Sequence, residues 1–419
     1  MNNEKQKIVP KLRFPEFVNS GNWIEKRLAD YEELTSGDGD WILAKDITTN
    51  GEHQIVQLSS IGFGIFKEKE LKTISNDTFS ELKGTPIFKG DLLINRMVDS
   101  DKINTCIFPH QGNYVTSVDV CWIRENQFFN NFFFMNLLCT NSNQIKLLGL
   151  SSGAGRVRIS KKNLFEKFVF DIPTNPKEQQ KIAACLSSLD EVITAETEKL
   201  DLLQDHKKGL LQQLFPAEGE TVPKFRFPDF MEDGDWEETT LDEVADYENG
   251  KAHEQEISDT GKYKVVNSKF ISTDGEVVKF TDSANLMANS GDILMVLSDI
   301  PNGKAIAKCF YVEEDNTYTV NQRICKITPK DIYNRFLFYI QNRNKYFLAF
   351  DDGVKQTNLR KETVLSFPFL KPKDPKEQEK IATCLTLADD LIKKQADKID
   401  SLQAHKKGLL QQLFPNIND

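Results

Sequence analysis

The stretch that decides the fold is PKEQQKIAACLSSLDEVITAETEKLDLLQDHKKGLLQQLFP, residues 176–216, because the chain repeats it nearly unchanged. The second copy, PKEQEKIATCLTLADDLIKKQADKIDSLQAHKKGLLQQLFP, occupies residues 375–415. A shorter pair, PKLRFPEF at 10–17 and PKFRFPDF at 223–230, precedes a Trp in each copy. The offsets differ (375 − 176 = 199 and 223 − 10 = 213), so the segments between the repeats differ in length. Near-identical flanks around divergent middles indicate a pseudo-two-fold repeat within one chain.

Each long repeat predicts one long helix. Asn175 or Thr174, and Asp374 in the second copy, stand just before a proline, which is an N-cap followed by a first-turn proline. Pro216 and Pro415 end the pattern. Apolar residues recur with 3-4 spacing, which is typical of a coiled coil. The predicted seam consists of Leu186, Leu189, Ile193, Leu200, Leu203, Leu210 and Leu214 in the first copy, and of Leu385, Ala388, Ile392, Ile399, Leu402, Leu409 and Leu413 in the second.

The order of the segments predicts the direction of the two helices. The first helix delivers the chain to the second variable segment, and the second helix leaves that segment, so we expect an antiparallel pair. Two seam positions are polar in both copies, Glu196 with Gln395 and Lys207 with Lys406. Polar seam residues commonly fix the register at some cost in stability. The alternative is that each helix packs only on its own domain.

The variable segments, 23–174 and 236–373, predict mixed α/β domains and an α+β fold class overall. Both contain short apolar runs bounded by turn residues, and a Gly-Asp pair before such a run is typical of a turn followed by a strand. These runs are GDLLINRM (90–97), YVTSVDVCWI (114–123), GDILMVLSD (291–299) and YTVNQRICKI (318–327); FNNFFFMNLLCTN (129–141) and NRFLFYIQNRNKYFLAF (334–350) predict short helices.

Composition excludes several classes of protein. The 419 residues carry a net charge of −10, so any nucleic-acid surface must be a local basic patch. No apolar run reaches the length of a membrane span, and the polar start MNNEKQKIVPK predicts no secretory signal. Seven cysteines without a CxxC pair argue against a disulfide framework or a zinc ribbon, which predicts a reducing, cytoplasmic location.

The chain lacks the motifs of an adenine methyltransferase or an ATPase. NPKE at 175–178 is a helix start rather than an NPPY motif, Gly62-Phe63-Gly64 is an isolated GxG, and there is no P-loop. The cysteines lie in or near apolar runs and predict buried small hydrophobic residues. The histidines have no metal-ligand spacing, so neither a catalytic nor a metal site is predicted. They are His53, His110, His206, His253 and His405.

The duplicated PKEQ-x-KIA…HKKGLLQQLFP block and the two domains with GD strands resemble the specificity subunit of bacterial type I restriction–modification systems. The resemblance covers essentially the whole chain. It implies two target recognition domains, each reading one half of a bipartite site in double-stranded DNA. It further implies two methyltransferase subunits on the helices and up to two motor–nuclease subunits. S-adenosylmethionine, and ATP with magnesium, would then be bound by those partners and not by this chain.

On this basis the chain divides into six parts. They are an N-terminal repeat motif (1–22), a first target recognition domain (23–174), a central helix (175–216), a linker with the second short repeat (217–235), a second target recognition domain (236–373) and a C-terminal helix (374–419).

Candidate DNA-binding residues lie in three sets of polar segments: the two Gly-tipped loops, the loops after the two GD strands, and residues 321–323. The Gly-tipped loops GAGRVRISKK (153–162) and GVKQTNLRK (353–361) hold the strongest local clusters, and the loops after the GD strands hold others. Arg suits guanine, Gln and Asn suit adenine, and Lys suits phosphate. The candidates are Asn95, Arg96, Lys102, Arg156, Arg158, Lys161 and Lys162 in the first domain, and Ser298, Asn302, Lys304, Asn321, Gln322, Arg323, Lys355, Gln356, Asn358, Arg360 and Lys361 in the second.

Two other functions stay open on the sequence alone. A duplicated coiled-coil scaffold that binds only proteins would explain the helices but not the paired basic loops. A self-contained modification enzyme would need the cofactor and catalytic motifs that the sequence lacks. The sequence therefore favours a non-catalytic DNA-recognition subunit.

Overall fold

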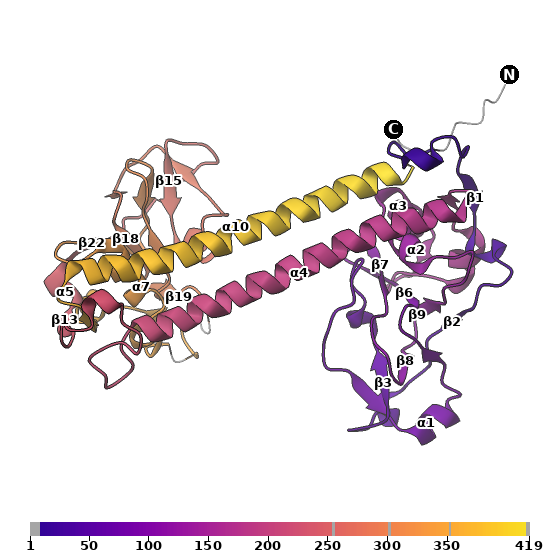
Figure 1. Ribbon diagram of the computed structural model, residues 1–419, viewed down its shortest axis with the longest axis horizontal. Coiled ribbons are helices and arrows are strands. Elements are labelled where there is room, and N and C mark those ends of the chain that lie inside the picture. The colour runs from indigo at the N-terminus through magenta and orange to yellow at the C-terminus, as the bar shows by residue number, and fades with distance from the viewer. Residues whose placement is uncertain (1–8, 254–255, 301–302, 352, 416–419) are drawn as a thin grey trace. The chain divides into compact units, whose positions relative to one another are not determined.

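The computed structural model describes residues 9–253, 256–300, 303–351 and 353–415. The chain forms two compact units, of which the first is discontinuous in sequence and the second is one continuous stretch (Figure 1). Unit 1 is Met1–Thr197 with Asp397–Asp419, and unit 2 is Glu198–Ala396. Each unit contains one α/β domain and one half of each long helix, α4 (Pro176–Leu214) and α10 (Pro375–Leu413).

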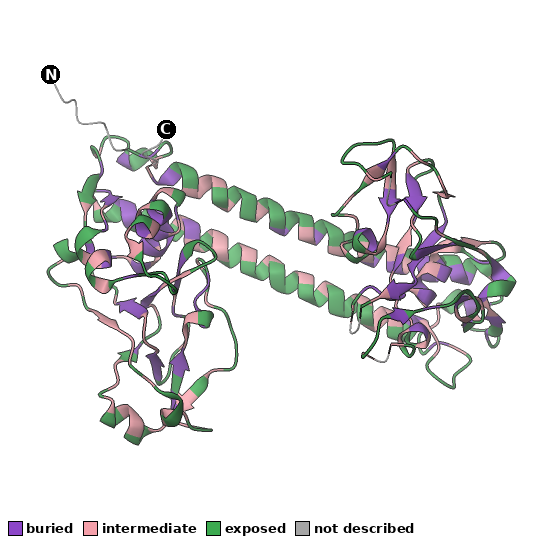
Figure 2. Ribbon diagram, turned by 180° about the vertical axis from the view of Figure 1, so that it is seen from behind, coloured by how far each residue is buried: buried purple, intermediate pink, exposed green. Residues whose placement is uncertain are grey.

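The predicted helix starts are confirmed. The side chain of Asn175 accepts a hydrogen bond from the Lys177 amide at 3.0 Å, and the side chain of Asp374 accepts one from Lys376 at 2.8 Å. Figure 2 shows that the central stretches of both helices are largely exposed. Every predicted seam residue is nevertheless at least half-buried: Leu186, Leu214, Leu385, Ala388, Ile399 and Leu413 are buried, and Leu189, Ile193, Leu200, Leu203, Leu210, Ile392, Leu402 and Leu409 are half-buried.

Ion pairs between the helices establish the antiparallel direction within unit 1. Asp190 pairs with Lys406, and Glu196 pairs with Lys398 at 2.6 Å, so the partner number falls as the α4 number rises. In unit 2, Lys207 of α4 pairs with Asp389 of α10. The polar seam lysines are therefore satisfied by carboxylates of the facing helix, which is how a polar seam residue specifies one register.

The short repeat serves as an anchor for the start of each long helix. In unit 1 the Arg13 guanidinium donates two hydrogen bonds to the buried Glu178 carboxylate, each at 2.7 Å, and a third to the Gly21 carbonyl at 2.7 Å. The indole nitrogen of Trp23 donates to the same carboxylate at 3.3 Å. A bidentate arginine and an indole thus satisfy a charge that would otherwise be costly to bury.

Unit 2 repeats this anchor with the equivalent residues and nearly the same hydrogen-bond distances. Arg226 donates to Glu377 at 2.9 and 2.8 Å and to the Gly234 carbonyl at 2.6 Å, while Trp236 donates to Glu377 at 3.4 Å. The RFP motif, the tryptophan and the first-turn glutamate of the helix are therefore one structural device. The sequence showed that they recur together but not that they touch.

Unit 1 contains two main sheets. The six-stranded sheet has the order β10-β11-β6-β9-β2 with β7 added beside β6, and the four-stranded sheet has the order β4-β3-β8-β5, in which only β3 and β8 are parallel. The predicted run 90–97 lies mostly in β6, and the predicted helical run 129–141 contains α2 and ends where α3 begins. The elements are β2 (Ser36–Asp38), β3 (His53–Val56), β4 (Lys72–Ile74), α1 (Asn76–Glu81), β5 (Pro86–Ile87), β6 (Leu92–Asp99), β7 (Lys102–Ile107), β8 (Tyr114–Thr116), β9 (Val120–Ile123), α2 (Asn131–Leu138), α3 (Asn141–Gly149), β10 (Ser151–Ser152), β11 (Arg158–Ile159), and the pair β1 (Ile24–Lys26) with β12 (Phe170–Ile172).

Unit 2 repeats the scheme with a four-stranded sheet and a separate strand pair in place of the six-stranded sheet. Its sheets have the orders β14-β22-β18-β20 and β16-β15-β21-β17, with β15 and β21 parallel, and β19 pairs with β23. The elements are β13 (Glu237–Thr240), α5 (Leu241–Val244), β14 (Ala245–Asn249), β15 (Tyr263–Val266), α6 (Ser268–Ser272), β16 (Phe280–Thr281), β17 (Met287–Ala288), β18 (Ile293–Val296), β19 (Ser298–Asp299), β20 (Cys309–Tyr311), β21 (Tyr318–Val320), β22 (Ile324–Pro329), α7 (Asn334–Gln341), α8 (Lys345–Leu348), β23 (Thr357–Asn358), α9 (Lys361–Leu365) and β24 (Pro368–Lys371).

The Gly-Asp turns have the predicted form. Gly90 and Gly291 have φ angles of +94° and +93°, a region that favours glycine, and each precedes a buried strand. The runs 114–123 and 318–327, in contrast, are not single strands. Each is split between two sheets by a turn, β8 to β9 in unit 1 and β21 to β22 in unit 2.

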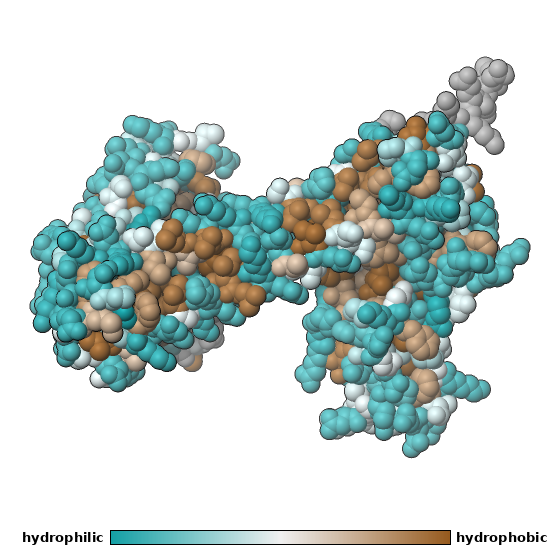
Figure 3. All heavy atoms as spheres, in the orientation of Figure 1, coloured by the Kyte–Doolittle hydropathy of each residue, from teal (hydrophilic) through white to brown (hydrophobic). Residues whose placement is uncertain are grey.

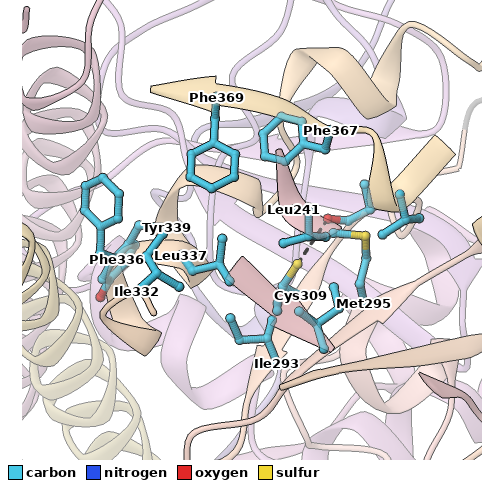
Figure 4. Packing of buried hydrophobic residues seen from close by; sticks show 14 of the residues in the cluster. Leu241, Ile293, Met295, Cys309, Ile332, Phe336, Leu337, Tyr339, Phe367 and Phe369 are labelled. Atoms are coloured by element: carbon cyan, nitrogen blue, oxygen red, sulfur yellow. Dashed lines mark hydrogen bonds between the residues drawn. The ribbon is translucent and has the colours of Figure 1, made fainter. Parts of the chain in front are cut away.

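Each unit has its own apolar core, and the ends of the long helices complete both. In unit 1 the core includes Leu186 of α4 and Leu413 of α10, and in unit 2 it includes Leu214 and Leu385. Figure 4 shows the packing around Phe336, Phe367 and other members of the unit 2 core. The same leucines that form the helix seam are therefore also core residues of the domains. Both packing schemes considered from the sequence contribute.

Candidate nucleic-acid interface

The loop 153–157 and strand β11 bring arginines to one edge of the six-stranded sheet in unit 1. Arg158 pairs with Met97 of β6 in register, and its side chain is 54% exposed. Gly153 has a φ of +149°, and a Cβ there would lie 2.2 Å from the Arg156 carbonyl, so only glycine fits this turn. The tight turn leaves Arg156 exposed and places Arg158 beside the end of β6.

Arg158 belongs to a carboxylate–arginine array, which we define as Asp38, Arg96, Asp119 and Arg158. The Nη1 of Arg158 donates a hydrogen bond to Asp119 Oδ1 at 2.9 Å. The same oxygen lies 3.2 Å from Nη2 of Arg96, whose Nε lies 3.3 Å from Asp38 Oδ1. Charges therefore alternate through the array, and its formal sum is zero.

Backbone contacts also hold this array in place. Asp119 has a φ of +70°, in the left-handed region, and its carbonyl accepts the Arg96 amide at 2.9 Å. Asp and Asn tolerate this conformation better than most residues. The Arg96 Nη1 also lies 3.5 Å from the Ile159 carbonyl. Asp119 therefore holds both the main chain and the side chain of Arg96.

Unit 2 has the same backbone contacts at the corresponding edge. The Leu297 amide donates to the Arg323 carbonyl at 2.9 Å, as Arg96 does to Asp119. Asn358 pairs with Ser298, as Arg158 pairs with Met97. Asn249 pairs with Cys325, as Asp38 pairs with Cys121. The positions that correspond to Asp38, Arg96, Asp119 and Arg158 are therefore Asn249, Leu297, Arg323 and Asn358.

The side chains at this edge of unit 2 are polar but not arranged as alternating charges. Arg323 and Asn358 are exposed, and Leu297 is buried. Gln356 donates from its amide to Ser298 Oγ at 2.6 Å. The Asp299 carboxylate accepts the Ala305 amide at 2.6 Å, which closes the adjoining loop. In the described part of unit 2, Arg323 has no carboxylate partner.

The sequence-predicted candidates divide by exposure. Three of them are buried. Asn95 accepts a hydrogen bond from the Met97 amide at 2.9 Å and shapes the irregularity in β6, Arg96 lies inside the array, and Ser298 is held by Gln356. These three residues therefore hold neighbouring parts of the protein in place and are not surface loop residues. Asn302 lies outside the described residues.

The remaining candidates are exposed or half-exposed and lie on both units. Lys102, Arg156, Arg158, Lys161 and Lys162 lie on unit 1; Lys304, Asn321, Gln322, Arg323, Lys355, Gln356, Asn358, Arg360 and Lys361 lie on unit 2. On the face drawn in Figure 3, hydrophilic side chains cover most of each unit.

Sequence reasoning missed Asp38 and Asp119, which complete the array. Both are acidic residues in an acidic chain, so composition gave no reason to select them. The left-handed turn at Asp119 also lies within what looks like one apolar run. Only the pairing of β9 with both β2 and β6 brings these carboxylates to the arginines.

The cysteines and histidines outside this array are packed as structural residues. Burial raises the pKa of the Cys106, Cys121 and Cys325 thiols to about 12, which keeps them protonated and unreactive at neutral pH. His53 stacks on Phe79 at 4.0 Å, and His253 contacts Thr319 at 3.0 Å. Within the described ranges, no group of three or more His, Cys, Asp or Glu residues is arranged to hold a metal.

Each unit also has a pocket beside its helices. The pocket in unit 1 measures about 830 Å³ and lies between α2, α3 and the end of α10, and the one in unit 2 measures about 370 Å³. The unit 2 pocket is lined in part by Leu387 and Leu391, which are 59% and 54% exposed.

None of the helices in the described part of the chain is both long and apolar enough to cross a membrane.

Comparison with known proteins decides the family. The sequence profile of the type I restriction modification DNA specificity domain matches residues 18–205 and 233–404. The chain belongs to this family. The two matched stretches are the two copies of the duplication, so each copy is a type I specificity domain. This is the resemblance that the repeated helices and GD strands indicated.

Relatives of this specificity-domain chain agree with the assignment. The specificity subunit of the type I restriction enzyme MjaVIII from Methanocaldococcus jannaschii is 26% identical over 330 residues, 74% of this chain and 75% of its own. The crystal structure of the type I restriction–modification S subunit from M. genitalium has a TM-score of 0.61 at 18% identity, covering 98% and 100% of the two chains. A chain from a structural study of type I complex assembly and conformational transition has a TM-score of 0.54 at 16% identity, covering 94% and 98%. At these identities the two structural matches establish the fold alone.

Proposed function

We propose that this chain is the DNA-recognition subunit of a type I restriction–modification complex and that each unit reads one half of a bipartite site. The observation that carries the proposal is the pair of corresponding sheet edges. Both keep the same backbone hydrogen bonds, yet Asp119 and Arg158 are replaced by Arg323 and Asn358. A common scaffold with different polar side chains at equivalent positions is what reading two different half-sequences requires.

The chemistry would be carried out by partner subunits. In this proposal two methyltransferase subunits bind the chain, transfer a methyl group from S-adenosylmethionine to adenine N6, and are joined by up to two motor–nuclease subunits that use ATP with magnesium. Apolar side chains exposed on the long helices support protein docking there. Val192, Leu202, Leu387 and Leu391 are between 44% and 69% exposed, and Val192 corresponds to Leu391 in the repeat. Exposed apolar side chains clustered on a helix commonly mark protein interaction surfaces.

The acidic balance of the chain supports local rather than general contact with DNA. With a net charge of −10, long-range attraction to phosphate is weak, so individual cations at the sheet edges carry more of the binding. The methyltransferase subunits would supply further phosphate contacts.

The test is to express the chain with its cognate methyltransferase subunits and to map N6-methyladenine in the host DNA. We expect one bipartite motif, and we expect its loss when this chain is omitted. A complex that assembles but methylates without sequence preference would contradict the proposal. It would favour the duplicated protein-binding scaffold instead.

A further inference from the structure

Two arginines of unit 1 lie two residues apart but have different electrostatic surroundings. Arg158 shares Asp119 with Arg96 inside the neutral carboxylate–arginine array. Arg156 is exposed, and within the described part of unit 1 it has no ion-pair partner. Contact with phosphate depends on uncompensated positive charge and the release of counterions. Arg156 retains that charge, whereas Asp119 largely offsets that of Arg158.

We propose that Arg158 is a specificity-determining residue that reads a guanine in the first half-site, and that Asp119 is the residue that positions it, with Arg96 and Asp38 behind. Arg156 contacts phosphate. This inference rests on the proposed function and assigns separate roles to the two arginines. It also gives a role to two carboxylates that lie on an otherwise DNA-facing edge.

The geometry suits a bidentate contact with a base. Asp119 engages the Nη1 of Arg158, and no contact of its Nη2 or Nε is found among the described residues, so these donors of the exposed, planar guanidinium are available to a base. Guanine presents O6 and N7 acceptors side by side in the major groove, and arginine matches this pair. A carboxylate that fixes the guanidinium lowers the entropy lost on binding, since the side chain is already ordered.

The Arg96 side chain prevents Asp119 from repelling DNA. Arg96 is buried, its amide donates to the Asp119 carbonyl, and its guanidinium faces both Asp119 and Asp38. The buried cation therefore offsets one of the two carboxylate charges, and Arg158 offsets the other, at an edge that approaches phosphates. In unit 2 the corresponding residues, Leu297 and Arg323, need no such compensation because no carboxylate occupies the turn.

The experiment measures equilibrium binding of the complex with methyltransferase subunits to its mapped site, to every single-base-pair substitution of the first half-site, and across salt concentrations. For Arg158→Ala we expect discrimination at one G·C pair to fall by about 5- to 150-fold, with other positions unchanged. Arg158→Lys keeps the charge but lacks the planar fork, so it should lose the same discrimination.

Arg156→Ala is the matched control from the same loop. It should weaken binding to all sequences alike and lower the salt slope by about 0.9, the value for one phosphate contact. If Arg158→Ala behaves in this way instead, Arg158 contacts phosphate and the inference is wrong. An Arg158→Ala complex that binds every sequence as the wild type does would also overturn it.

Asp119→Asn separates positioning from folding. Asn tolerates the left-handed turn, so the backbone should persist, while the array gains one net positive charge. We expect tighter binding to non-cognate DNA, a steeper salt slope, and poorer discrimination at the same base pair as for Arg158→Ala. A merely structural role would weaken cognate and non-cognate binding together. If the wild-type complex itself shows no preferred sequence, the proposed function fails before this inference is tested.

Discussion

The two units share the same buried anchor at the start of each long helix, but they differ in the side chains at the edges of their sheets. Arg13 with Glu178 and Arg226 with Glu377 form the same buried anchor. At the sheet edges, the backbone bond from residue 96 to 119 recurs between 297 and 323, yet the acidic Asp119 is replaced by Arg323. Because main-chain hydrogen bonds hold the edges, their side chains are free to differ without loss of the fold.

The anchors should give the largest effects, and equal ones in both units. Glu178→Ala and Glu377→Ala each leave a buried arginine without its partner, so each should cost about 3–5 kcal/mol of the stability of its own unit. Hydrogen exchange of β1 and β12, compared with β13 and β24, measures the two losses separately.

Lys181→Ala is the control for the anchors. Lys181 pairs with Glu16 on the surface near the first anchor, so its loss should leave exchange unchanged. A large loss for one glutamate and none for the other would show that the anchors are not equivalent devices.

The second prediction concerns the edge of unit 2. Arg323→Ala and Asn358→Ala should each reduce discrimination by about 1–3 kcal/mol at one position of the second half-site. Both side chains are exposed, so folding should be preserved. The measurement is binding of the complex to single-base-pair substitutions of both half-sites. Altered preference in the first half-site would argue against separate reading by the two units.

The smallest effect is expected for a phosphate contact in unit 2. Lys361→Ala should weaken all sequences alike and lower the salt slope by about 0.9, because a lysine is a point charge that neutralises one phosphate. Lys361 lies over the Tyr247 ring at 5.6 Å, so thermal unfolding should be followed as a control for lost packing. An unchanged salt slope would remove Lys361 from the interface.

The sequence predicted the long helices, their caps, the GD turns and the exposed arginines, because each depends on local chemistry. The residues next to Pro176 and Pro375 determine where the two long helices start. It did not predict that Arg96 is buried or that Asp119 accompanies Arg158. Those contacts join residues 23 and 39 positions apart through strand pairing, which no local pattern encodes.

The splitting of residues 114–123 into β8 and β9 has a similar cause. Alternating apolar residues favour a single strand, but Asp119 adopts a positive φ and the chain changes sheets there. The corresponding turn at 321–323 holds a candidate group that the sequence did select, because it contains Asn, Gln and Arg. Where the same turn carries Ser, Val and Asp, residue type gave no signal.

The most direct test of the central claim is the map of N6-methyladenine in cells that express the complete system with either the wild-type chain or Arg158→Ala. We expect a bipartite motif for the wild type and, for the variant, the same motif with one G·C requirement relaxed in a single half. A variant motif that is changed in both halves, or a wild type whose methylation follows no motif, would contradict it.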